Sequence, residues 1–204
     1  GVVWKTLGSE GLPVVNVNGP RYGAIYGADR RLLGLNNIEL ITDRDLYTNL
    51  EEIKRVKADY PDRAMIVSIM VPCEEQAWKD ILPLVEDTGA DGIELNFGCP
   101  HGMSERGMGA AVGQVPEYIE MVTRWCKQYY SKPVIVKLTP NITDIRKPAA
   151  AASTDPIRPV PGRCLAQSSE ASRTNAFGDV VGTHPDRQVG ATVAMRRAWR
   201  ITRW

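Results

Sequence analysis

One cysteine lies where a reactive group is expected, in a glycine-rich segment that follows a predicted strand. Residues 96–109 read NFGCPHGMSERGMG, and the fourth of them is Cys99. Glycines let a backbone fold closely over a ligand, and a loop thiol can act as a nucleophile, a redox group or a proton donor. A packed loop cysteine without a chemical role is the alternative, and it is the more common case for a lone cysteine.

Two lysines lie inside or at the end of apolar strands, Lys5 in VVWKTL and Lys137 in VIVKLTP. Charged side chains are rarely buried without a partner. Each lysine therefore either pairs with a carboxylate, such as Glu94 or Glu39, or faces an anionic ligand. Because two lysines take equivalent places in different units, a shared electron-rich ligand is about as good an explanation as two salt bridges.

Three asparagines could read the edge of a heterocycle, because an amide offers a donor and an acceptor side by side. Flavins and pyrimidines carry the complementary pair. Turn formation is the ordinary explanation for Asn36 and Asn37, whereas Asn96 follows the strand residues IEL and is harder to explain as a turn.

The other cysteines, Cys73, Cys126 and Cys164, are interpreted as packing residues. The four cysteines have irregular spacing and no C-x-x-C pair. The spacing therefore argues against a disulfide framework and against a zinc site, and we expect no metal.

The segments that must position these residues alternate between apolar patterns typical of strands and apolar patterns typical of helices. Apolar strands are predicted over residues 1–7, 64–70, 92–97 and 133–138, and helices over 46–60, 74–88, from 116 and from near 143. Such alternation predicts an α/β fold whose parallel sheet is buried on both faces. Residues 8–45 are expected to form a functional loop or a small subsheet. No G-x-G-x-x-G follows a strand, so a (β/α)8 TIM barrel is favoured over a doubly wound sheet.

Composition excludes several classes of protein. The 204 residues are 43% hydrophobic and 24% charged, with a mean hydropathy of −0.25. No run approaches the ~18 apolar residues of a membrane helix. Membrane, collagenous and disulfide-stapled proteins are thus disfavoured, and a cytoplasmic globular enzyme is favoured.

The basic residues of the chain change from a mixture of lysine and arginine to arginine alone after residue 152. Residues 1–152 hold 8 Lys and 9 Arg against 20 acidic residues, whereas 153–204 hold 8 Arg, no Lys and 4 acidic residues. A basic tail that binds nucleic acid is one interpretation of 153–204. The favoured interpretation is a non-homologous Arg-rich tail, disordered or translated out of frame.

Four motifs taken together resemble those of the dihydropyrimidine dehydrogenases: WKT at 4–6, LNNIEL at 35–40, the 96–109 segment, and KLTPN at 137–141. The FMN-containing, pyrimidine-reducing subunit of bacterial two-subunit enzymes is the most similar form. Class I dihydroorotate dehydrogenases share the general barrel and are the nearest alternative.

The resemblance implies a (β/α)8 barrel of the dihydroorotate/dihydropyrimidine dehydrogenase type that binds FMN. By matching position it implies a set of flavin-lining residues: Lys5, Thr6, Asn37, Glu39, Asn96 and Lys137. It further implies that Asn37 and Asn96 hydrogen-bond the pyrimidine. Cys99 is implied as the general acid.

The implied reaction is the reduction of uracil or thymine to the 5,6-dihydropyrimidine, the first step of pyrimidine catabolism. Electrons would come from NAD(P)H through an FAD-binding partner subunit. Iron–sulfur clusters are expected only in the partner or in parts absent from this chain. The intact enzyme is expected to be an oligomer in the cytoplasm, with no nucleic-acid or membrane partner.

The sequence also departs from the family's pattern. Gly98 stands where the animal enzymes have serine, and Gly1 begins at what resembles the second strand. The likeness runs to about Lys147, so residues 1–152 are expected to form a partial FMN-binding barrel and 153–204 to be unrelated. We therefore expect the chain by itself to be inactive, and a non-functional product of a disrupted gene is an alternative.

Overall fold

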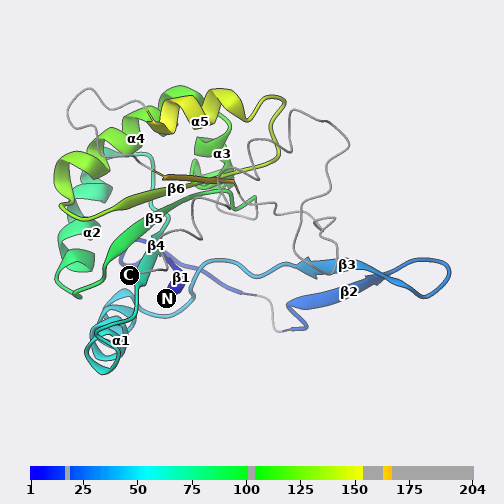
Figure 1. Cartoon of the computed structure of the whole chain (residues 1–204), viewed down its shortest axis with the longest axis horizontal. Coiled ribbons are helices and arrows are strands. Elements are labelled where there is room, and N and C mark those ends of the chain that lie inside the picture. Colours follow the sequence, from blue (N-terminus) through cyan, green and yellow to red (C-terminus); the bar gives the residue numbers. More distant parts are fainter. Residues whose placement is uncertain (17–18, 101–103, 154–162, 167–204) are drawn as a thin grey trace. The chain divides into compact units, whose positions relative to one another are not determined.

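Five parallel strands form the main sheet. The computed structural model describes residues 1–16, 19–100, 104–153 and 163–166. The strands follow one another across the sheet in chain order: β1 (Val2–Leu7), β4 (Met65–Ile69), β5 (Gly92–Phe97), β6 (Val134–Leu138) and β7 (Arg163–Ala166). All neighbouring pairs are parallel, as Figure 1 shows for the strands of this unit.

Helices connect the strands, as the alternating pattern predicts. They are α1 (Leu46–Asp59), α2 (Glu75–Glu86), α4 (Pro116–Tyr129) and α5 (Arg146–Ser153). The carboxylate of Asp45 caps α1 by accepting from the Thr48 N–H over 2.9 Å. Pro116 occupies the first turn of α4, where its missing N–H costs no hydrogen bond and its φ is already helical.

The four helices pack on one face of the sheet. Alternate strand residues, such as Ile93 and Leu95 of β5, join a single core with apolar side chains of α1, α2, α4 and α5. Both are fully buried, and burying such a side chain stabilises the fold by about 1.5–3 kcal/mol. All six residues of β5 are buried, so this strand is buried on both of its faces, as predicted. Within the described residues, polar side chains such as Glu94 and Asn96 lie on the face opposite the helices.

Strand order and helix placement together confirm the predicted fold class. A doubly wound sheet reverses its strand order and carries helices on both faces. Here the order is sequential and the connecting helices share one face, which is the arrangement of a (β/α) barrel. The described strands form a part of such a barrel.

The chain divides into two compact units, residues 1–16 with 40–167 and residues 17–39 with 168–204. In the second unit the structure describes an antiparallel hairpin of β2 (Tyr22–Tyr26) and β3 (Leu32–Asn37). The small subsheet expected within residues 8–45 is thereby confirmed.

Some elements differ from the prediction. Two short helices, η1 (Ser104–Arg106) and α3 (Ala110–Gly113), follow β5 and were not expected. Residues 153–204 were expected to hold no regular element, yet β7 pairs with β6. The residues RCLA are too few to show a period. The rest of that tail, 154–162 and 167–204, lies outside the described residues.

No helix among the described residues is long and apolar enough to cross a membrane.

Candidate functional site

A line of polar side chains crosses four strands near their carboxyl ends. Its members each precede the last residue of a strand: Thr6 of β1, Ser68 of β4, Asn96 of β5 and Lys137 of β6. Glu94, two residues before Asn96, completes what we call the polar line. Ligands of parallel α/β folds bind at this end of the sheet.

Pairing register brings these residues together. Ser68 lies opposite Glu94 between β4 and β5, and Asn96 lies opposite Lys137 between β5 and β6. Residues two apart on a strand share a face. The polar line therefore occupies the face of the sheet opposite the helices.

Hydrogen bonds run through the whole line. Thr6 Oγ1 lies 2.9 Å from Ser68 Oγ, and Ser68 donates to Glu94 Oε1 over 2.8 Å. Lys137 Nζ lies 2.9 Å from that same Glu94 oxygen. Asn96 Nδ2 donates to Thr6 Oγ1 over 3.0 Å. Thr6, Asn96 and Lys137, three of the predicted flavin-lining residues, thus belong to one network.

Burial makes the ion pair of the polar line necessary. Glu94 is 7% exposed and the Lys137 side chain is 15% exposed. A charge buried to this degree needs a partner, and each supplies the other's. The salt bridge considered for Lys137 therefore exists. Lys5 precedes Thr6 in β1 and is half-buried.

Cys99 lies three residues beyond Asn96, in the segment that leaves β5. Its side chain is half-buried and packs with the small apolar cluster of Ile41, Met70 and Met108. Its carbonyl oxygen accepts from Ala110 N over 3.0 Å and from Ser104 Oγ over 3.1 Å. Two donors from η1 and α3 thus fix the backbone that carries the thiol.

Gly109 allows α3 to approach this backbone. Its φ of +59° is a conformation that side chains rarely adopt, and a Cβ at this position would lie 2.6 Å from the Cys99 carbonyl oxygen. We expect Gly109→Ala to lower the free energy of unfolding by about 3 kcal/mol, because strain and collision add. Urea unfolding followed by circular dichroism measures this loss.

Gly107 supplies the matched control. Its φ is +71°, but nothing lies within 4 Å of the position of its Cβ. Gly107→Ala should therefore cost only the left-handed strain, about 1 kcal/mol. Equal losses in the two variants would mean that the contact with Cys99 does not constrain Gly109.

Two predicted residues, Asn37 and Glu39, lie in the second unit. Asn37 Oδ1 accepts from the Glu39 N–H over 2.8 Å, a local turn contact. Glu39 accepts from Tyr22 Oη over 2.6 Å and pairs with Arg21 over 3.2 Å. The hydrogen bond to Glu39 raises the pKa of Tyr22. The structure thus shows the turn role that the sequence left open for Asn37, while its ligand role stays a prediction.

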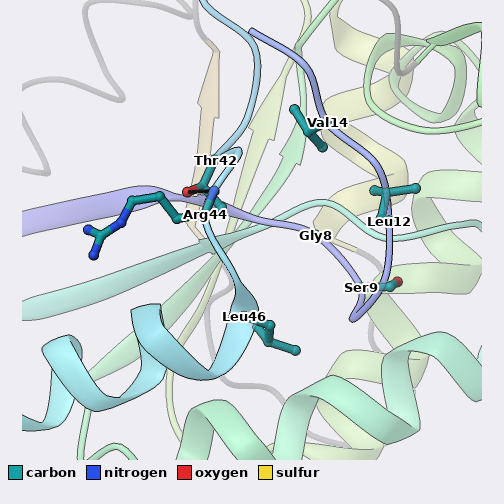
Figure 2. Close-up of a pocket in the computed structure, with 7 residues that line it drawn as sticks. All are labelled: Gly8, Ser9, Leu12, Val14, Thr42, Arg44 and Leu46. Atoms are coloured by element: carbon teal, nitrogen blue, oxygen red, sulfur yellow. Dashed lines mark hydrogen bonds between the residues drawn. The ribbon is translucent and has the colours of Figure 1, made fainter.

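A small pocket lies beside the end of β1, in the same unit as the polar line. Figure 2 shows its lining residues: Gly8, Ser9, Leu12, Val14, Thr42, Arg44 and Leu46. Its volume of about 20 Å³ admits one water molecule. Arg44 points away from Leu12 and Val14 (Figure 2) and donates two hydrogen bonds to Glu52. This pocket is too small for a flavin or a pyrimidine.

A larger pocket, about 330 Å³, lies at the opposite end of the sheet, where β1 and β4 begin. Gly1, Val2 and Met65 line it together with Val56 and Tyr60 from the end of α1. No residue of the polar line contributes to it. The chemistry predicted from the sequence therefore points to the polar line on the face opposite the helices rather than to this pocket.

The other described cysteines behave as packing residues. Cys126 is fully buried in α4, and burial raises the pKa of its thiol well above the usual range. Burial also raises the pKa of the half-buried Cys73. All three cysteines whose side chains the structure describes are free. In the part of the chain that the structure describes, no cluster of three or more His, Cys, Asp or Glu residues could hold a metal ion.

Sequence reasoning missed Ser68. It lies 1% exposed within the otherwise apolar strand MIVSI, and its polarity there was the available signal. Glu94 was considered only as a partner for a lysine. Its central place in the polar line depends on strand register, which sequence alone does not give.

The sequence that forms this site matches a known protein family. A model of the dihydrouridine synthase (Dus) family matches residues 34–152, more than half of the chain. The stretch includes Glu94, Asn96, Cys99 and Lys137.

Individual relatives are similar over much of the chain. Dihydropyrimidine dehydrogenase (NADP(+)), chloroplastic, of Arabidopsis thaliana is 46% identical over 153 residues, which cover 72% of this chain and 36% of that protein. NAD-dependent dihydropyrimidine dehydrogenase subunit PreA of Escherichia coli (strain K12) is 41% identical over 152 residues, 74% of this chain and 36% of that protein. The predicted resemblance is confirmed.

A dihydroorotate dehydrogenase is also similar. The catalytic subunit of dihydroorotate dehydrogenase B (NAD(+)) of Pyrococcus abyssi is 42% identical over 155 residues, 74% of this chain and 46% of that protein. The chain therefore spans less than half the length of each of these three curated relatives.

Proposed function

This chain belongs to the dihydrouridine synthase (Dus) family, and on that premise we propose that it is a flavin-dependent oxidoreductase of uracil and thymine. The polar line carries the proposal. It gathers a cation, an amide and hydroxyls at the carboxyl end of a parallel sheet, followed by a loop thiol. The names of the relatives in Arabidopsis and E. coli support the pyrimidine as substrate.

The donor set of the polar line suits FMN. Lys137 would face the electron-rich ring system, and a nearby cation stabilises the negative charge of its reduced form. Asn96 offers an amide to the complementary edge of the flavin or the pyrimidine. Lys5 and Thr6 would contribute from β1, and for Asn37 and Glu39 the proposed flavin contact rests on the resemblance alone.

When bound and reduced by the partner subunit, FMN would supply the hydride that reduces C6 of the pyrimidine. Cys99 would donate its proton to C5, which completes the saturation of the double bond. A thiol is mostly protonated at neutral pH and can act as such an acid. The resulting thiolate would regain its proton from solvent before the next turnover.

A partner subunit would deliver the electrons. The E. coli relative is named a subunit and NAD-dependent, which supports a partner that oxidises NAD(P)H through FAD. We place the reaction in pyrimidine catabolism in the cytoplasm. Iron–sulfur clusters would lie in the partner or outside the matched region.

A dihydroorotate dehydrogenase is the second candidate, because the Pyrococcus abyssi relative carries that name at 42% identity. Dihydroorotate differs from dihydrouracil by a carboxylate. The two candidates are therefore separated by which compound the site accepts.

A chimera tests the proposal, with residues 1–152 of this chain in place of the matched stretch of the E. coli relative. We expect the chimera to retain bound flavin, seen by its absorbance, and to oxidise NADH when uracil and the partner subunit of the E. coli enzyme are added. Activity with dihydroorotate but not uracil would favour the second candidate. A chimera that folds without flavin would contradict both.

A further inference from the structure

We infer that Glu94 and Ser68 are positioning residues, and that they fix the direction of a hydrogen-bond chain that orients the Asn96 amide. The inference rests on the proposed function, which gives Asn96 its role toward flavin and pyrimidine. It concerns residues for which the sequence pattern predicted no role in the reaction. The chain runs from Glu94 through Ser68 and Thr6 to Asn96.

The direction follows from counting protons. An ionised carboxylate can only accept, so Ser68 donates to Glu94 Oε1. A serine hydroxyl has one proton, and Ser68 uses it in the hydrogen bond to Glu94, so it can only accept from Thr6. The contact between Thr6 and Ser68 admits either donor by distance alone, but only Thr6 still has a proton to give.

The same count continues to the amide. Because Thr6 donates its one hydroxyl proton to Ser68, its oxygen can only accept in the contact with Asn96. Asn96 must therefore turn Nδ2 toward Thr6, as observed over 3.0 Å. The Glu94 carboxylate thus determines the orientation of the Asn96 amide through three successive hydrogen bonds.

An independent contact requires the same orientation. The Gly98 backbone N–H, which can only donate, lies 3.3 Å from Asn96 Oδ1. The oxygen of the amide is thus held by the segment that leads to Cys99, and the nitrogen by β1. The two ends of the amide agree, so neither a flipped amide nor a reversed chain satisfies all of the contacts.

One oxygen of Glu94 serves both branches of the polar line. Glu94 Oε1 lies 2.8 Å from Ser68 Oγ and 2.9 Å from Lys137 Nζ. The positions of the Lys137 ammonium and, through Ser68 and Thr6, of the Asn96 amide therefore both depend on this one oxygen atom. Because Ser68, Glu94 and Asn96 are each buried, water does not readily replace a broken link, and hydrogen bonds are stronger in such surroundings.

Orientation matters because an amide is not symmetric. A flipped Asn96 would present a donor where a ligand edge expects an acceptor, and two mismatched contacts would replace two matched ones. Fixing the amide before the ligand arrives removes that alternative. Glu94 and Ser68 would act on binding in this way without touching flavin or pyrimidine.

The test measures hydrogen exchange of the Asn96 side-chain NH2 group by NMR in the full chain. Ser68→Ala removes one oxygen and cuts the chain between Thr6 and Glu94. We expect exchange to become roughly tenfold faster, as the loss of one buried hydrogen bond allows. Thr6→Val, which keeps the side-chain shape, cuts the next link and should have at least the same effect.

Two controls separate orientation from general loosening. Thr6→Ser keeps the hydroxyl, so exchange should stay close to that of the parent. Thr123→Val removes another buried hydroxyl, on α4, for which the described residues offer no hydrogen-bond partner. It should leave Asn96 unchanged.

Unchanged exchange in Ser68→Ala would overturn the inference, and so would equal acceleration in Thr123→Val. The measurement needs no flavin. A chimera that failed to bind FMN would therefore count against the proposed function alone, while the exchange result would still decide whether the chain orients Asn96.

Discussion

Cys99→Ala, made in the chimera, should lower the rate of pyrimidine reduction by ~10²–10⁴-fold, the usual loss when a positioned general acid is removed. Flavin absorbance and its bleaching by NADH in the presence of the partner subunit should persist, because the proposal gives the thiol no contact with the electron source. Stopped-flow absorbance separates the two half-reactions. The side chain packs against Ile41, Met70 and Met108, and alanine preserves most of that packing.

Two variants serve as controls for this result. Cys99→Ser should also be slow, because a hydroxyl is a far weaker acid than a thiol. Cys73→Ala should turn over like the parent, since Cys73 is half-buried against the main core. If Cys99→Ala reduced uracil within a few fold of the parent, Cys99 would be a packing residue and not the proton donor.

Glu94→Gln should be among the most destabilising single changes in the polar line. It leaves the Lys137 ammonium, 15% exposed, without a countercharge. Breaking a buried ion pair from one side costs about 3–5 kcal/mol, because an uncompensated charge stays buried. Urea unfolding should show this loss as a lower transition midpoint.

An exposed pair on α4 gives the matched comparison. Glu120 and Arg124 lie 39% and 47% exposed and form a salt bridge of 2.5 Å. Glu120→Gln should cost at most ~0.5 kcal/mol, since water screens such pairs. Adding Lys137→Met to Glu94→Gln should restore much of the lost stability. A Glu94→Gln loss no larger than that of Glu120→Gln would show that water reaches Lys137.

Much of the fold could be predicted because its strands are continuous apolar runs. GIELNF predicted β5 over the residues that form it, and Pro116 marked the start of α4. The short elements α3 and β7 span four residues each. A pattern needs more residues than that before it shows a period.

The candidate site was predicted where charge or an amide interrupted an apolar run, as at Lys137 and Asn96. Ser68 carried a weaker signal, because a lone hydroxyl is unremarkable in a strand. Its importance comes from lying opposite Glu94, and such registers arise from tertiary pairing. The local sequence could not show this.

The links of the polar line span very different lengths of chain. Ser68 and Glu94 are 26 residues apart, Thr6 and Ser68 are 62 apart, and Asn96 and Thr6 are 90 apart. Closing a longer loop costs more conformational entropy, and distant contacts slow folding. The contacts of β1 are thus the most costly of these to form.

Thr6 makes both of the long-range links. A chain that has paired β4 with β5 but has not yet added β1 would hold Ser68 and Glu94 in place, while the Asn96 amide would lack the contact of its nitrogen with Thr6 and keep only the contact of its oxygen with the Gly98 N–H. The proposed binding groups are therefore fully ordered only once β1 has joined the sheet, and a molecule that lacks this pairing would have a lower affinity for its ligands.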